Sequence, residues 1–320
     1  MSSRPRLGIS ACLLGHNVRW DGGQKRSRFL ADVLGAHVDW VPVCPELELG
    51  LGVPRETLRL VGLPSRPRLV APRSGQDHTE AMESLAAARA EALAKEDLCG
   101  FVLKKDSPSC GLERVRVYRE SGVPLKDGAG VFARALRARL PALPVEEEGR
   151  LEDSALRERF VERVFALRRW KDALAEGLDP GRLVAFHARH KLQLMAHSPA
   201  HVTRLGRLVA RAGREDVVDA YGRLFAEALA VPASRGRVVN ALQHMAGYVS
   251  PALTPAERRE LGGLFSEYAA GKAPLAVPLV LVEHHLRRQG VGYLAQQSWL
   301  GPYPGSLALR YSVAASGLAG

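Results

Sequence analysis

Three of the four cysteines stand in separate turns that glycine or proline marks: Cys12 in Ile-Ser-Ala-Cys-Leu-Leu-Gly, Cys44 in Val-Pro-Val-Cys-Pro-Glu and Cys110 in Ser-Pro-Ser-Cys-Gly. Their number is odd for a disulfide framework, and their spacing differs from the paired cysteines of a zinc finger. Thiolate is a soft ligand that binds zinc and iron–sulfur clusters. Three thiolates from distant turns would hold a cluster at three corners and leave the fourth open to a substrate, as a Lewis acid requires.

The same cysteines allow two other interpretations, a cysteine nucleophile or thiols that are only structural. The fourth cysteine, Cys99, directly precedes the apolar segment Gly-Phe-Val-Leu and lies outside any marked turn. We therefore expect Cys99 to be a small buried hydrophobic residue.

Polar residues lie close to two of the turn cysteines. Glu46 follows Cys44 by two residues, and Ser107 and Ser109 precede Cys110. Near a metal centre a carboxylate can act as general acid or base, and a serine hydroxyl can relay or orient a proton or a water. Taken in isolation, these residues favour a simpler interpretation, in which the serines cap a turn and the glutamate is solvated.

Basic residues near the same turns could bind an anionic substrate: Arg19, Arg55, Lys104 and Lys105. Each residue of this kind is more often a surface charge.

The secondary structure expected around the cysteines places them at one edge of a sheet. Three short apolar segments predict buried strands: residues 7–13, 37–43 and 100–103. Three other segments predict helices: residues 25–36, 79–94 and 131–139. Strands that alternate with helices indicate an α/β domain with a mostly parallel sheet, in which ligands gather at the carboxyl ends of the strands. Because each turn cysteine falls at or after the end of a predicted strand, we expect one shared site.

The chain changes character after an acidic run at residues 145–149. From there almost every segment predicts a helix: 154–176, 181–196, 199–212, 215–229, 234–248, 255–270 and 275–289. Ser198-Pro199 and Thr254-Pro255 each combine an N-cap residue with proline at the first helical position. The sequence thus predicts an α/β domain at residues 1–146 and an all-α domain at residues 150–320.

Residues 182–214 carry seven Arg or Lys and no Asp or Glu. Two adjoining helices with such one-sided charge predict a face that contacts RNA phosphates, for which we single out Arg189, Lys191, Arg204, Arg207 and Arg211. A solvated basic face is the plainer alternative. A metal site is a third, because His187 and His190 lie three residues apart, yet no acidic residue or cysteine accompanies them.

The composition limits the class of protein. The 320 residues fit two domains, and the net charge of +11 favours a polyanionic partner, although an Arg-rich composition alone gives a similar charge. The longest apolar run is too short to span a bilayer, and the first residues lack the apolar region of a signal peptide. We expect a cytoplasmic protein without membrane contact, and nothing in the sequence implies an obligate protein partner.

Three motifs, in order, resemble the thiouracil desulfidase (TudS) family over roughly residues 7–140. They are Ser-Ala-Cys-Leu-Leu-Gly-x-x-Val-Arg-Trp-Asp-Gly at 10–22, Val-Cys-Pro-Glu with Gly-Val-Pro-Arg at 43–46 and 52–55, and Lys-x-x-Ser-Pro-Ser-Cys-Gly at 104–111. The remainder resembles the YbgA-like helical domain through Phe-His-x-x-His-Lys-x-x-Leu-Met-Ala-His-Ser-Pro at 186–199 and Pro-Tyr-Pro at 302–304. This two-domain arrangement is similar to that of desulfidases acting on 4-thiouridine in tRNA.

The resemblance implies a [4Fe–4S] cluster bound by Cys12, Cys44 and Cys110, with the fourth iron open to the substrate sulfur. It also implies a hydrolytic reaction without net redox change, in which water activated by Glu46 replaces that sulfur and hydrosulfide is released. Ser107 is the first choice for an assisting serine and Ser109 the second. The partner implied is tRNA.

Three alternatives stay open at this point. One is a desulfidase that acts on free thiouracil or thiolated nucleosides. Another is a non-enzymatic RNA-binding protein whose cluster senses redox state or metal. A zinc hydrolase that uses the same cysteines is the third.

Overall fold

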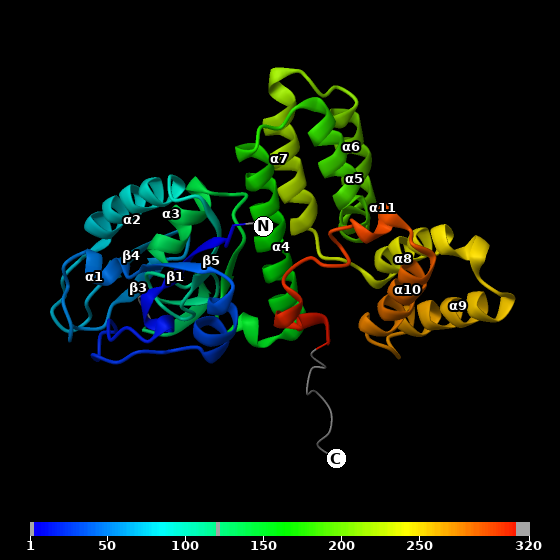
Figure 1. The fold of residues 1–320 in the computed structure, drawn as a ribbon. Helices are drawn as coiled ribbons and strands as arrows, with labels where there is room; N and C mark the ends of the chain where they lie inside the picture. Colours follow the sequence, from blue (N-terminus) through cyan, green and yellow to red (C-terminus); the bar gives the residue numbers. More distant parts are fainter. Residues whose placement is uncertain (1–2, 120–121, 312–320) are drawn as a thin grey trace, which may run out of the picture. The chain divides into compact units, whose positions relative to one another are not determined.

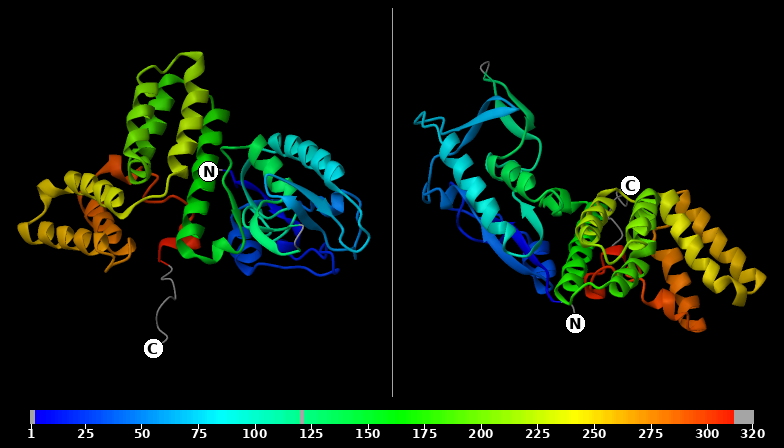
Figure 2. Two further views of the ribbon diagram at one scale, coloured as in Figure 1. Left: turned by 180° about the vertical axis from the view of Figure 1, so that it is seen from behind. Right: turned by 90° about the horizontal axis from the view of Figure 1, so that it is seen from above.

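The computed structural model describes residues 3–119 and 122–311, so the end of the predicted second domain, residues 312–320, lies outside it. The chain forms two compact units that divide at Phe160 and Val161. Figures 1 and 2 show the fold, with strands only in the first half of the chain and helices throughout the second. An α/β region followed by a helical region was predicted and is confirmed.

Four strands form the parallel sheet A of the first unit. They are β1 (Arg6–Ser10), β2 (Asp39–Val43), β5 (Leu98–Leu103) and β8 (Val145–Glu147), in the order β2-β1-β5-β8. All three strand pairs are parallel. Every residue of β5 is buried, as expected of a central strand that is covered on both faces. The three predicted strands are thus confirmed. A fourth strand that was not predicted, β8, pairs with β5 and completes the sheet.

Two of the three predicted helices of this unit are confirmed at both ends, α2 (Thr79–Ala94) and α3 (Val131–Arg139). They lie side by side in Figure 1. The helix predicted at residues 25–36 is wrong in its first turn, since only a π-helical segment at Phe29–Val33 and a 3₁₀ turn at Leu34–Ala36 form. The Lys25 and Ser27 amides instead donate to the carbonyls of Cys12 and Leu13, at 2.9 Å each, which holds this segment against the turn after β1.

A second sheet, sheet B, was not predicted. It contains β3 (Arg59–Leu63), β4 (Arg66–Val70), β6 (Val115–Tyr118) and β7 (Pro124–Gly128), in the order β4-β3-β6-β7. The pairs β3–β4 and β6–β7 are antiparallel, and β3 and β6 run parallel. Only one face of these strands is buried, through residues such as Leu60, Leu69 and Val117.

The second unit is helical. Its helices are α4 (Ser154–Ala175), which begins in the first unit, α5 (Pro180–His197), α6 (Pro199–Val209), α7 (Glu215–Ala230), α8 (Arg235–Val249), α9 (Pro255–Ala269), α10 (Ala276–Gln289) and the short α11 (Gly292–Ala295). Each predicted helix of this half is present within a few residues. Thr254 and Glu257 form a capping box at α9, whereas the Ser198 side chain makes no capping bond at α6.

Two apolar cores hold these helices together. One surrounds Trp170, Tyr221 and Phe225, and the other contains Met245 and Trp299. Among the described residues, no helix combines the length and apolar character that crossing a bilayer requires.

Candidate active site

Three strand ends of sheet A bring the turn cysteines to one cavity. Cys12 lies in a 3₁₀ turn directly after β1, and Cys44 separates β2 from the short helix α1 (Pro45–Glu48). Cys110 lies in the loop that follows β5. All three line a cavity of about 510 Å³, a size typical of small-molecule sites. Cys99, in contrast, is fully buried within β5, as expected.

The protonation of the three thiols argues against a cysteine nucleophile. Burial raises the pKa of the Cys12 thiol to about 11. Burial also raises the pKa of Cys44 and of Cys110. The Glu46 charge adds to the effect at both thiols, and the charges of Cys12 and Cys44 add to it at Cys110. Reactive cysteines need the opposite shift, whereas a coordinated metal removes the thiol proton outright.

The donor set fits a cluster better than a single ion. Within residues 3–119 and 122–311, no three His, Cys, Asp or Glu side chains are arranged so that they could hold one metal ion. A four-iron cluster spreads its corner ligands more widely than one ion does, and three thiols lining one cavity suit that requirement.

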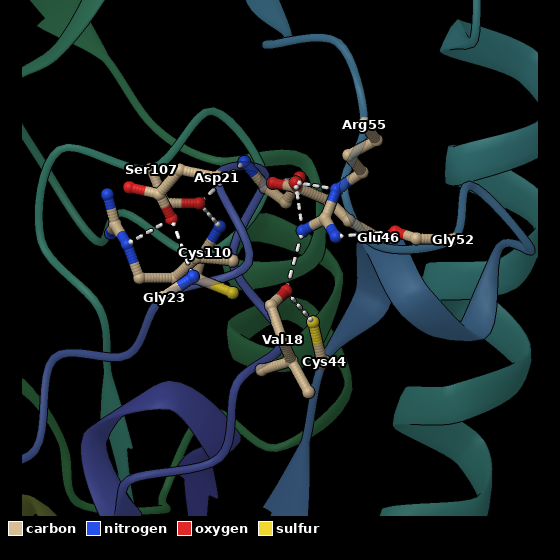
Figure 3. A network of polar contacts seen from close by, with 11 residues as sticks. Val18, Asp21, Gly23, Cys44, Glu46, Gly52, Arg55, Ser107 and Cys110 are labelled. Atoms are coloured by element: carbon tan, nitrogen blue, oxygen red, sulfur yellow. Dashed lines mark hydrogen bonds and ion pairs between the residues drawn. The ribbon is translucent and has the colours of Figure 1, made fainter.

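Glu46 occupies the first turn of α1, and its carboxylate accepts hydrogen bonds from two side chains, of which Figure 3 shows Arg55. Arg55 donates to its Oε2 from Nε at 2.9 Å and from Nη2 at 2.8 Å. Ser109 donates from Oγ to Glu46 Oε1 at 2.9 Å. The Glu46 side chain is 15% exposed and that of Arg55 only 6%. Glu46 is therefore not the solvated residue of the simpler interpretation, and Arg55 is not a surface charge.

Arg55 also ties the carboxylate to the loop beside Cys44. Its Nη2 donates to the Val18 carbonyl at 3.0 Å and its Nη1 to the Gly52 carbonyl at 2.9 Å. The Cys44 thiol donates to the same Val18 oxygen at 3.7 Å. One guanidinium thus joins Glu46, the Val18 carbonyl and, through it, a cysteine of the site, as Figure 3 shows.

The two predicted serines play different parts. Ser107 lines the cavity, but its Oγ accepts from the amides of Ser109 and Cys110, so it caps the cysteine turn. Ser109 is fully buried and contacts Glu46 directly. A third serine, Ser10, hydrogen-bonds the Cys110 thiol, which works to lower the pKa of that group, and accepts from the Lys104 amide at 3.0 Å. Of the predicted pair, Ser109 is the one that touches the candidate base.

Sequence reasoning missed the role of Arg55, Ser10 and Glu148. Lys104 lines the cavity and forms an ion pair with Glu148. Ser10 stands two residues before Cys12 at the end of β1, a position that could have identified it. The Glu46–Arg55 pair had no such signal, because a loop of the intervening residues brings the two side chains together.

The five predicted RNA-binding residues lie in the second unit, exposed on α5 and in or just after α6: Arg189, Lys191, Arg204, Arg207 and Arg211. Arg204 and Arg207, three residues apart, share one side of α6, and Arg211 follows in the turn after the helix, 3.9 Å from Asp216. The two histidines considered as a metal site have other contacts: His187 Nδ1 lies 3.1 Å from the Tyr221 hydroxyl, and His190 is buried against Phe186. In the described part of the chain neither belongs to a group of side chains that could hold a metal ion.

Comparisons with known proteins match the two halves of the chain to different families. Residues 7–148 match the family described as 2-thiouracil desulfurase, and residues 191–304 match a family described as a protein of unknown function (DUF1722). The uncharacterized protein YbgA of Escherichia coli (strain K12) is 30% identical over 154 residues, which cover 47% of this chain and 91% of YbgA. The uncharacterized protein YbbK of Bacillus subtilis (strain 168) is 35% identical over 139 residues, covering 40% and 87%.

A solved structure, that of the [4Fe-4S]-dependent thiouracil desulfidase TudS, is 33% identical, covers 46% of this chain and 93% of its own, and gives a TM-score of 0.38. With its cysteine-lined cavity in the matched first half and the YbgA-like helices in the second, the chain belongs to the 2-thiouracil desulfurase family, fused to a YbgA-like DUF1722 domain.

Proposed function

We propose that this protein is a [4Fe–4S]-dependent desulfidase that converts 4-thiouridine in tRNA to uridine and releases hydrosulfide. The observation that carries the proposal is the convergence of Cys12, Cys44 and Cys110 on one cavity that also contains Glu46. Family membership supports sulfur removal from a thiolated uracil ring. Such a substrate would place the reaction in the cytoplasm.

Cys12, Cys44 and Cys110 would hold the cluster by their thiolates. When bound, the cluster would supply an open iron site that acts as a Lewis acid toward the thiocarbonyl sulfur. Lys104, whose charge works to lower the pKa of Cys12, would offset part of the negative charge of the thiolates.

Glu46 is the group placed to handle the proton of the attacking water. Its Oε2 is engaged by Arg55 and its Oε1 by the Ser109 hydroxyl, so the carboxylate keeps one orientation at the cavity wall. An oxygen that accepts one hydrogen bond still has a free lone pair, with which Oε1 can take a proton from water. Water would add to the ring carbon as the carbon–sulfur bond breaks, leaving a carbonyl oxygen on the base and hydrosulfide as the product.

The first experiment is anaerobic purification followed by iron and acid-labile sulfide analysis. Cys12→Ala, Cys44→Ala and Cys110→Ala are each expected to lower the iron content, and Cys99→Ala, which removes a buried thiol within β5, is expected to keep it. Equal iron content in all four variants would refute the ligand set. Zinc without iron or sulfide in the parent protein would favour the zinc hydrolase instead.

The second experiment measures turnover. Anaerobic incubation with tRNA that contains 4-thiouridine, followed by mass spectrometry of the nucleosides, is expected to show uridine in place of 4-thiouridine. Turnover of free thiouracil but not of tRNA would support the free-base desulfidase. An iron-containing protein that binds tRNA and turns over neither substrate would support the RNA-binding sensor.

The exposed cations of α5 and α6 support tRNA as the substrate. Arg204→Ala/Arg207→Ala/Arg211→Ala is expected to weaken tRNA binding by about tenfold or more, because each lost phosphate contact removes a counterion-release contribution. The matched control is Arg258→Ala/Arg259→Ala/Arg287→Ala, which removes three basic side chains from α9 and α10. Equal losses in both variants would mean that net charge alone, rather than the α6 face, binds tRNA.

A further inference from the structure

The outward face of sheet B presents a row of basic side chains that the proposed function does not use. Side chains alternate between the two faces of a strand, and directly paired residues share a face. The register pairs Val61 with Arg68 and with Tyr118, and Arg116 with Lys126. The opposite face carries Leu60, Leu69 and Val117 in the core.

Five residues on the outward face are Arg or Lys, and none of its paired positions holds Asp or Glu: Arg59, Arg66, Arg68, Arg116 and Lys126. All five are exposed. Arg68 lies 3.5 Å from Asp77. The other four have no carboxylate partner among the residues that the structure describes. We call these five residues the sheet B basic face.

This face continues into the cavity. Arg59, Arg116 and Tyr118 belong to the cavity wall, and the Arg59 guanidinium lies 4.6 Å from the centre of the Tyr118 ring. Two exposed lysines, Lys25 and Lys105, also line the cavity.

Within residues 3–119 and 122–311, the inner cations Arg55 and Lys104 have carboxylate partners, whereas the outer cations Arg59 and Arg116 have none. Arg55 is paired with Glu46, and Lys104 with Glu148. Since no described carboxylate faces Arg59 or Arg116 at the outer wall, both can bind an anion. A free thiouracil base carries no phosphate and would gain nothing from them.

We propose that the sheet B basic face binds the phosphate backbone of the RNA strand on either side of the nucleotide whose base enters the cavity. The inference rests on the proposed function for the identity of the strand, since a polyanion that also bears a thiolated base is a nucleic acid. Guanidinium groups bind phosphate oxygens through paired hydrogen bonds, and a Tyr ring with an Arg above it offers a surface for a sugar or a neighbouring base. The first unit thus contributes its own RNA contacts, separate from those of α5 and α6.

The test compares two double variants of the full-length holoprotein in binding to fluorescein-labelled, unmodified tRNA, followed by anisotropy over a range of salt concentrations. Arg59→Ala/Arg116→Ala is expected to weaken binding by about tenfold at low salt and to reduce the slope of log K against log salt by about 1.5, since each phosphate contact contributes 0.7 to 0.9. Lys95→Ala/Arg137→Ala removes two exposed cations, one at the residue that follows α2 and one on α3, and is expected to leave both quantities nearly unchanged.

A third variant, Arg59→Lys/Arg116→Lys, separates charge from folding. It keeps two cations and is expected to retain most of the slope. The proposal is overturned if the alanine pair binds tRNA like the control pair, as it would if the face served an acidic protein, or if the lysine pair loses as much as the alanine pair. Failure of the proposed function looks different: the parent protein would bind tRNA with the full slope and leave 4-thiouridine intact.

Discussion

Glu46 combines two properties that a general base at this site needs, a fixed orientation and a place at the cavity wall. Arg55 and Ser109 donate hydrogen bonds to different oxygens of its carboxylate, and Arg55 also donates to the Val18 carbonyl. Because burial and hydrogen bonds fix all three side chains, the site can aim one lone pair without reorganising during the reaction.

Replacement of Glu46 by glutamine is therefore expected to lower kcat by about 10² to 10⁴, the usual contribution of a general base. The amide keeps the shape of the side chain but cannot take a proton, so the iron content should stay at the parental level. Ser109→Ala is expected to lower kcat less, by about tenfold, because it removes only the hydrogen bond that orients Oε1. The measurements are single-turnover rates on 4-thiouridine tRNA and iron per chain.

The matched control is Glu83→Gln, which changes an exposed carboxylate on α2 and should leave the rate unchanged. A Glu46→Gln protein with the parental rate would show that another group activates the water.

The second unit contains a buried acid whose protonation bears on stability rather than on chemistry. Burial acts to raise the pKa of Glu162, but the hydrogen bond and charge of His197, with the Arg310 charge and the Gln193 hydrogen bond, outweigh it and hold that pKa at about 2. Since the unfolded carboxyl titrates near 4.5, this group stabilises the fold fully above about pH 4.5 and loses that effect as pH falls toward 2.

Glu162→Gln should accordingly reduce the acid sensitivity of the helical unit. We expect faster amide hydrogen exchange in α5 for the variant than for the parent at pH 7, and a difference that shrinks between pH 5 and pH 2. At neutral pH the lost stabilisation is about 3 kcal/mol. Glu260→Gln, on an exposed turn of α9, serves as the control. A difference between parent and variant that stays constant with pH would contradict the assigned role of Glu162.

At the scale of elements, the N-terminus of α3 holds the Cys110 loop in place. The Gly130 amide donates to the Gly111 carbonyl at 2.7 Å, and the Phe132 amide donates to the Ser109 carbonyl at 3.0 Å. A Cβ atom on Gly130 would lie 2.4 Å from the Ser109 oxygen and 2.8 Å from the Cys110 nitrogen, closer than real contacts allow. The backbones of the helix and the loop meet so closely that only glycine fits there.

Gly130→Ala is thus expected to displace the loop that carries Cys110 and Ser109. Iron content and turnover should fall together, and amide exchange of residues 105–112 should accelerate even in protein without a cluster. Gly262→Ala, at a helical position of α9 where an added Cβ meets nothing within 4 Å, is expected to change none of these quantities. Unchanged exchange in the Gly130 variant would show that the loop does not depend on this approach.

The same elements explain what the sequence could predict. Strands β1, β2 and β5 were predictable because they are short apolar segments that end at marked turns, and parallel strands bring such ends to one edge. Sheet B was missed because segments such as Arg66–Val70 and Val115–Tyr118 alternate basic with apolar residues over only four or five positions. Strands this short are specified by their pairing partners more than by their own residues.

The sequence predicted which residues meet in the candidate site but not the contacts between them. Strand ends located the three cysteines together, with Glu46 and the serines beside them. The Arg55–Glu46 contact depends on the path of a loop, and the preference for Ser109 over Ser107 depends on which hydroxyl points at the carboxylate. Neither is encoded in local spacing, so only the folded chain reveals them.

At the scale of the whole molecule, the net charge of +11 favours binding of tRNA, which is a polyanion, but not of free thiouracil, which is neutral. In the part of the chain that the structure describes, cations without carboxylate partners line the cavity, as at Arg59 and Arg116, and occur on α6, as at Arg204 and Arg207. A polyanion can form ion pairs with cations of either set, whereas a neutral base that enters the cavity carries no charge to pair with them. Salt should therefore lower the catalytic efficiency toward tRNA strongly and that toward the free base only slightly.

Raising the salt concentration from 50 to 200 mM is expected to lower kcat/KM for 4-thiouridine tRNA by about tenfold or more, because phosphate contacts release counterions on binding. For free thiouracil, kcat/KM should change less than about twofold, since screening acts only on interactions between charges. Both substrates are assayed with one preparation of the anaerobic holoprotein, so any salt effect on the cluster appears equally in each. A parallel decline for tRNA and the free base would mean that salt acts on the site itself, and the case for an RNA substrate would then lose its electrostatic support.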